Sequence, residues 1–233
     1  MKIGVLLCDE VDDELIRTHG KYQDMYVKLL QQVDPDLQFL VYEVRSGEFP
    51  AYMDAADAYV ITGSRYGVND DLPWIAALEK WVRDIHTHEK KMIGICFGHQ
   101  LIAKALGGNV SKSPKGWGLG ISVNKMSQQK PWMRPHLKNL NLIVSHQDQV
   151  VDLPEYAEVL ASSDFCPFYM LQIKDNLFTV QGHPEYTKGY SQALMELRKN
   201  KLGEATVEKG LKSLQQHCDG AVFARWIVNF LNF

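Results

Sequence analysis

The 233-residue chain is predicted to form an α/β fold: an open, mostly parallel twisted sheet with helices on both faces and antiparallel strands added at the edge. Two observations predict this class. Short apolar runs alternate with helical patterns through the first half of the chain, which is typical of βαβ units. Between residues 116 and 180, short strand-like runs follow one another without helical patterns, which indicates antiparallel additions to the sheet.

The apolar patterns place the elements in order along the chain. They predict strands at residues 2–8, 38–44, 58–62 and 92–95. They predict helices at residues 21–32, 74–88, 96–106 and 221–231, with helical patterns from residue 187 onward. The helix at 96–106 is expected to stop at Gly107 and Gly108, since glycine is common at a helix C-terminus.

Composition and charge exclude several classes of protein. The net charge is −3 with scattered Arg and Lys, so no nucleic-acid partner is expected. No apolar run approaches the ~20 residues that span a membrane, and the run at residues 3–8 is too short for a signal peptide. We therefore expect a single domain over residues 1–233 that does not enter a membrane.

Cysteine usage points to the cytoplasm. The four cysteines form no Cys-x-x-Cys pair, which is typical of a reducing compartment and argues against disulfides or structural zinc. They are widely spaced, at Cys8, Cys96, Cys166 and Cys218.

Cys96 lies where a short apolar run, Met92–Ile95, meets the start of a predicted helix. The flanking Gly94 and Gly98 relieve the crowding of a tight turn at this place. The positive end of the helix dipole favours a thiolate, which is the nucleophilic form of cysteine. A buried structural cysteine is the alternative interpretation, since free cysteines are among the most buried residues.

His183 and Glu185 end another apolar run, residues 177–180, and Pro184 between them restricts the chain to extended geometry. Side chains two residues apart in an extended chain point to the same side. Glu185 could therefore orient His183 as a base for Cys96, which completes a nucleophile–base–orienter set.

Together these segments resemble the class I glutamine amidotransferases, a family with a flavodoxin-like fold. The nucleophile of that family lies in a Gly-x-Cys-x-Gly-His-Gln turn, matched here by residues 94–100, and a His-x-Glu pair follows about ninety residues later. The resemblance covers roughly residues 2–190. It implies that Cys96 attacks the side-chain amide of glutamine, that His183 relays the proton and that Glu185 orients His183, with no cofactor or metal.

The resemblance implies further site residues. The turn after the strand at 58–62 corresponds to the oxyanion turn of the family, so Gly63 or Ser64, with Phe97, is expected to donate backbone N–H groups. The family has Gly-Gly-Pro there, whereas this chain has Gly63-Ser64-Arg65. The remaining expected residues contact the amino-acid part of the substrate: Gln100, Ser145, His146 and Gln147. The segment 145–148 resembles the Ser-His-Gly-Asp segment of the family, with Gln147 in place of glycine.

The chain most resembles stand-alone proteins similar to the glutaminase domain of GMP synthetases. This resemblance leads to two hypotheses about the enzyme activity. The chain could supply ammonia from glutamine to a separate synthase subunit, or act alone as a γ-glutamyl peptidase on a small-molecule conjugate. A non-catalytic regulatory module is a third hypothesis, which the intact Cys96, His183 and Glu185 argue against. Relatives with chaperone or deglycase activity carry a histidine directly after the nucleophile, where this chain has Phe97.

An acidic run at residues 9–14 follows the first strand. We expect it to be a solvated loop that, with residues 65–70, borders the leaving amine at the carboxyl ends of the strands.

Overall fold

The computed structural model describes residues 1–233, and its centre is a nine-stranded sheet in the order β2-β1-β3-β4-β11-β10-β9-β6-β7. The parallel strands are β1 (Lys2–Leu6), β2 (Gln38–Tyr42), β3 (Ala58–Ile61), β4 (Lys91–Ile95) and β11 (Leu177–Val180). The antiparallel strands are β10 (Met170–Ile173), β9 (Ala157–Ser162), β6 (Gly118–Met126) and β7 (Asn139–His146). A small separate sheet pairs β5 (Asn109–Lys112) with β8 (Asp148–Asp152). The predicted fold class is confirmed.

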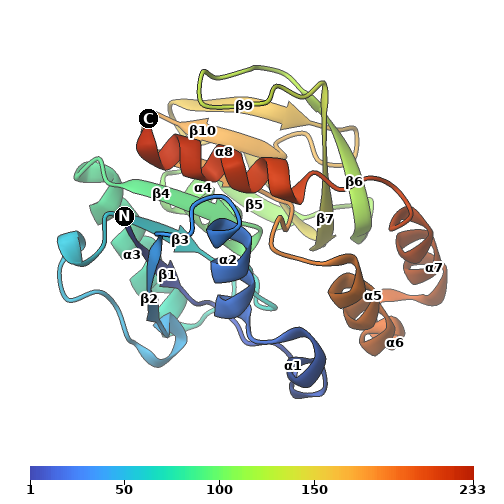
Figure 1. The fold of residues 1–233 in the computed structure, drawn as a ribbon. Coiled ribbons are helices and arrows are strands. Elements are labelled where there is room, and N and C mark those ends of the chain that lie inside the picture. The colour runs from blue at the N-terminus through green and yellow to red at the C-terminus, as the bar shows by residue number, and fades with distance from the viewer.

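Helices cover both faces of this sheet (Figure 1). Helices α2 (Tyr22–Gln31) and α8 (Gly220–Asn232) lie on one face, and α3 (Pro73–Thr87) and α4 (Phe97–Ala105) lie on the other. Helices α5 (Lys188–Leu197), α6 (Lys199–Leu202) and α7 (Glu204–Ser213) gather beside β6 and β7. The remaining helix, α1 (Asp13–His19), follows β1. No helix is long and apolar enough to cross a membrane.

Alternating side chains along the central strands fill two cores. In and after β1, Ile3 and Leu7 join a cluster of 44 buried residues, while Leu6 and Cys8 join one of 21. Successive side chains of a strand point to opposite faces, so one short apolar run feeds both cores. The larger cluster contains side chains of α2 and α8, so that face carries most of the apolar burial.

The register of the parallel strands brings three chain segments to one edge of the sheet. Ile61 pairs with Gly94, and Val180 pairs with Ile95. The residues that follow β3, β4 and β11 therefore meet at the carboxyl ends of the strands, where open α/β sheets bind ligands.

The acidic run at residues 9–14 is only partly the solvated loop that the sequence predicts, because Glu10, Asp13 and Glu14 are exposed whereas Asp9 is buried. Asp9 is only 2% exposed, and it accepts hydrogen bonds from the backbone N–H and Nε of Arg65 at 2.8 and 2.7 Å. Asp13 and Glu14 form the first turn of α1, where acidic side chains complement the helix dipole. The prediction was wrong for Asp9, because its partner Arg65 is distant in sequence.

Candidate active site

Cys96 occupies a strained turn between β4 and α4. Its φ is 51° and its ψ is −98°, a backbone conformation that residues other than glycine rarely adopt. Two hydrogen bonds hold the turn: Cys96 N–H donates to Val180 O at 2.9 Å, and Cys96 O accepts from Gln100 N–H at 3.1 Å. Strain of this kind persists only where the surrounding structure determines it, and it is concentrated at functional sites.

Gly98 lets α4 approach β3 closely enough to form this turn. A Cβ on Gly98 would lie 2.4 Å from Ile61 O and 2.8 Å from Ile61 Cβ. A Cβ on Gly94 would similarly lie 2.7 Å from Gly98 O. Both glycines are therefore required by packing.

We expect Gly98→Ala to lower the free energy of unfolding by about 1–3 kcal/mol, because overpacking displaces the backbone. Urea denaturation followed by circular dichroism measures the change. Gly189→Ala is the matched control: its Cβ would meet nothing nearer than 3.8 Å, so stability should stay the same or rise slightly. Equal stability of Gly98→Ala and the wild type would contradict this account of the turn.

His183 and Glu185 form a buried pair beside Cys96. His183 Nδ1 donates to Glu185 Oε1 at 2.7 Å, and both side chains are at most 3% exposed. A Cβ built on Gly63 would lie 2.7 Å from His183 Cε1 and 3.7 Å from Cys96 Cβ, so the imidazole and the cysteine flank the same glycine. The structure thus brings together the three residues that the sequence predicts as nucleophile, base and orienter.

Three buried histidines differ in pKa because only one of them faces a carboxylate. Burial lowers the pKa of His99 to about 3 and that of His146 to about 4. Burial also acts to lower the pKa of His183, but Glu185 and Cys96 outweigh it and raise that pKa to about 10. Glu185 thus favours the protonated form of His183, next to Cys96.

Two neighbours of the pair were not predicted from the sequence. Gln181 Nε2 donates to Cys96 Sγ at 3.4 Å, and the ring of Tyr186 stacks on His183 with centroids 4.0 Å apart. Gln181 could have been found, because residues 181, 183 and 185 share one side of an extended segment. Tyr186 carries no such signal in the sequence.

The turn after β3 is held from two directions. Gly63 N–H donates to Tyr26 Oη at 3.4 Å, and Ser64 Oγ donates to Cys8 O at 2.8 Å. Arg65, the next residue of the turn, forms salt bridges with Asp9 and Asp12. Its Nη1 lies 3.0 Å from Asp12 Oδ1. Ser64 N–H donates no hydrogen bond within the protein.

A pocket of about 540 Å³ opens onto Cys96. Six other predicted site residues line it: Ser64, Phe97, Gln100, Ser145, His146 and Gln147. Gln100 Nε2 is already bonded to Asp148 O at 2.7 Å and to Gln181 Oε1 at 3.0 Å. The pocket also includes Asp12 and residues 65–67, part of the border that the sequence predicts for the leaving amine.

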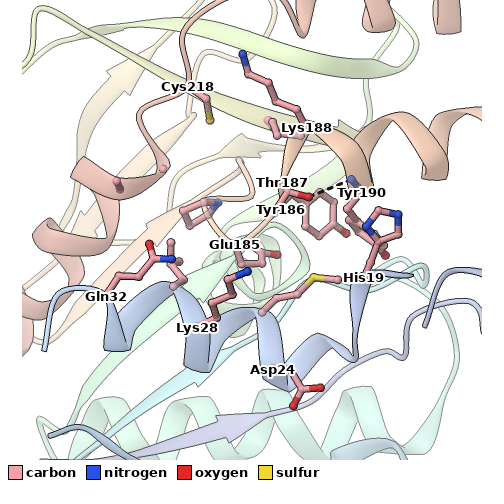
Figure 2. Close-up of a pocket in the computed structure, with 16 residues that line it drawn as sticks. His19, Asp24, Lys28, Gln32, Glu185, Tyr186, Thr187, Lys188, Tyr190 and Cys218 are labelled. Atoms are coloured by element: carbon pink, nitrogen blue, oxygen red, sulfur yellow. Dashed lines mark hydrogen bonds between the residues drawn. The ribbon is translucent and has the colours of Figure 1, made fainter. Parts of the chain in front are cut away.

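A second cavity, of about 360 Å³, is lined by Glu185 and Tyr186 but not by His183. Figure 2 shows Glu185 and Tyr186 between helix α2 and the start of α5, with Lys28 and Gln32 on the α2 side. Cys96 does not line this cavity, so it is not the pocket in which a substrate would meet the thiol. The structure contains no group of three or more His, Cys, Asp or Glu side chains placed to hold a metal ion.

Comparisons with known proteins identify the family and support the fold. A family model described as glutamine amidotransferase class-I matches residues 50–200. Gamma-glutamyl peptidase 4 of Arabidopsis thaliana is 37% identical over 179 residues, which cover 74% of this chain and 70% of that protein. A glutamine amidotransferase-like protein of Schizosaccharomyces pombe is 32% identical over 98% of both chains. The crystal structure of a glutamine amidotransferase from Thermotoga maritima superposes with a TM-score of 0.74 at 18% identity, over 99% of this chain and 96% of that one.

Proposed function

The chain belongs to the class I glutamine amidotransferase family, and we propose that it hydrolyses a γ-glutamyl amide through a thioester on Cys96. The observation that carries this proposal is the position of the hydrogen-bonded His183–Glu185 pair beside Cys96, which lies in a strained turn between β4 and α4. An imidazolium held beside a thiol in a strained strand-to-helix turn stabilises the thiolate, which is the attacking form of cysteine.

The proposed reaction has two steps. Cys96 Sγ attacks the γ-carbonyl carbon, the C–N bond breaks, and His183 gives its proton to the leaving amine. A water molecule, deprotonated by the now neutral His183, then attacks the thioester. The C–S bond breaks, which releases glutamate and restores the thiolate and the imidazolium. Glu185 keeps its charge throughout and holds Nδ1, so that the other ring nitrogen faces the reacting atoms.

Ser64 N–H is the better candidate for the oxyanion donor from the turn after β3. Gly63 N–H is engaged with Tyr26, whereas Ser64 N–H has no protein acceptor and its residue lines the Cys96 pocket. Phe97 N–H lies at the first position of α4, where backbone donors have no partner within the helix. These two amides would hold the oxyanion, a role worth about 3 kcal/mol per donor.

The pocket favours a γ-glutamyl peptide over glutamine as the substrate. A volume of about 540 Å³ is in the range of pockets that hold whole small-molecule ligands, and ammonia as leaving group would leave much of it empty. Arg65 and Arg198 at its border both pair with Asp12. Lys201 has no carboxylate partner, and its Nζ lies 5.8 Å from the centroid of the Trp117 ring. A leaving amine that carries a carboxylate would meet this positive charge.

We expect the isolated chain to hydrolyse γ-glutamyl dipeptides without ATP, metal or partner, with a kcat/KM at least about tenfold above that for glutamine, a ratio equal to about 1.4 kcal/mol of transition-state binding. Glutamate release is the measurement. The same dipeptide with its carboxylate amidated is the control, and it should react more slowly because it lacks the charge that Lys201 would meet. If activity on every amide stays at background until a synthase subunit is added, the result would instead favour a protein that supplies ammonia to a synthase.

A further inference from the structure

Tyr26 on α2 touches both halves of the proposed machinery, although the mechanism assigns it no step. Its hydroxyl donates to Glu185 Oε1 at 3.0 Å and accepts from Gly63 N–H at 3.4 Å. The side chain is 1% exposed, so water does not compete for these bonds. One hydroxyl therefore joins the carboxylate that orients His183 to the turn that precedes Ser64.

We infer that Tyr26 is a positioning residue for hydrolysis at Cys96, an inference that rests on the proposed function. By accepting from Gly63 N–H, Tyr26 turns that amide away from the pocket and leaves Ser64 N–H to face the substrate. By donating to Glu185 Oε1, it fixes which carboxylate oxygen accepts the hydrogen bond from His183 Nδ1. The Tyr26 hydroxyl on α2 thereby positions both the oxyanion donor, Ser64 N–H, and the base, His183.

The bonds of Glu185 support this role. Oε1 accepts from both His183 Nδ1 and Tyr26 Oη, whereas Oε2 is buried without any partner. A carboxylate that could bond through either oxygen would let the imidazole tilt, and Tyr26 removes that freedom. Burial raises the pKa of Tyr26 well above its usual value, and Glu185 acts in the same direction, so the hydroxyl keeps its proton and remains a donor.

Tyr26→Phe tests the inference because it deletes the hydroxyl and keeps the ring. We expect kcat on the best γ-glutamyl substrate to fall about tenfold to a hundredfold with KM within about twofold, since small misplacements of reacting groups cost rate rather than binding. Without substrate, the NMR resonance of the His183 Nδ1 proton should move further downfield, because Glu185 Oε1 then accepts from His183 alone. Tyr59→Phe is the matched control: it also deletes a buried hydroxyl, one bonded to Met53 O at 2.9 Å, outside the site.

The outcomes separate this inference from the proposed function. If Tyr26→Phe matches Tyr59→Phe in kcat and in the Nδ1 proton resonance, Tyr26 serves stability alone and the inference is overturned. An increase in KM at constant kcat would also overturn it, because that pattern belongs to a substrate contact. If the wild type hydrolyses no γ-glutamyl compound, the proposed function fails, and the proton resonance alone decides whether Tyr26 positions the His183–Glu185 pair.

Discussion

Replacing Cys96 with serine is expected to reduce glutamate release by about 10⁴-fold or more while the fold persists. The thiolate forms the covalent bond in the proposed mechanism, and a serine hydroxyl is a much weaker nucleophile than a thiolate. Coupled detection of glutamate measures the loss, and circular dichroism checks the fold. Retention of more than a few per cent of the activity would contradict the assignment of Cys96 as nucleophile.

The other three cysteines provide an internal control for that experiment. Burial raises the pKa of Cys8 and of Cys218, and it raises that of Cys166 to about 12, so these groups stay protonated at neutral pH. An electrophilic glutamine analogue should therefore add its mass to Cys96 alone, as read by peptide mass spectrometry. Labelling spread over all four cysteines would show that Cys96 has no special reactivity.

His183→Asn should cost nearly as much activity as the loss of Cys96, because it removes the cation beside the thiol and the acid for the leaving amine. Glu185→Gln should lose about a hundredfold less, since Glu185 only orients and stabilises His183. The ratio of kcat values between the two variants is the measurement. His136→Asn is the control, because His136 is exposed and does not line the pocket that opens onto Cys96. Wild-type rates in His183→Asn would refute the proposed role of His183.

Local patterns in the sequence predict the elements that carry the site. Short apolar runs predict β3, β4 and β11, and parallel strands bring their carboxyl ends to one edge, so the residues after them converge. Glycines around Cys96 predict the tight turn, and the i, i+2 spacing of His183 and Glu185 predicts their shared side. The ends of the elements were predicted less accurately. Strands β1 and β2 each end two residues before the predicted strand does, and after β2 the segment Val44–Ser46 forms a 3₁₀ turn.

What the sequence determined by itself is every feature that depends on neighbours along the chain: the alternating α/β elements, the turn at Cys96 and the His183–Glu185 spacing. Only the tertiary structure decided the contacts between distant segments. Asp9 is buried under Arg65, 56 residues away, and Tyr26 binds Glu185 across 159 residues. Tyr26 also accepts a hydrogen bond from Gly63 N–H, which leaves Ser64 N–H as the free amide of the turn. No periodicity encodes such pairs, because they depend on where helix α2 and the loop after β1 pack against the strand ends.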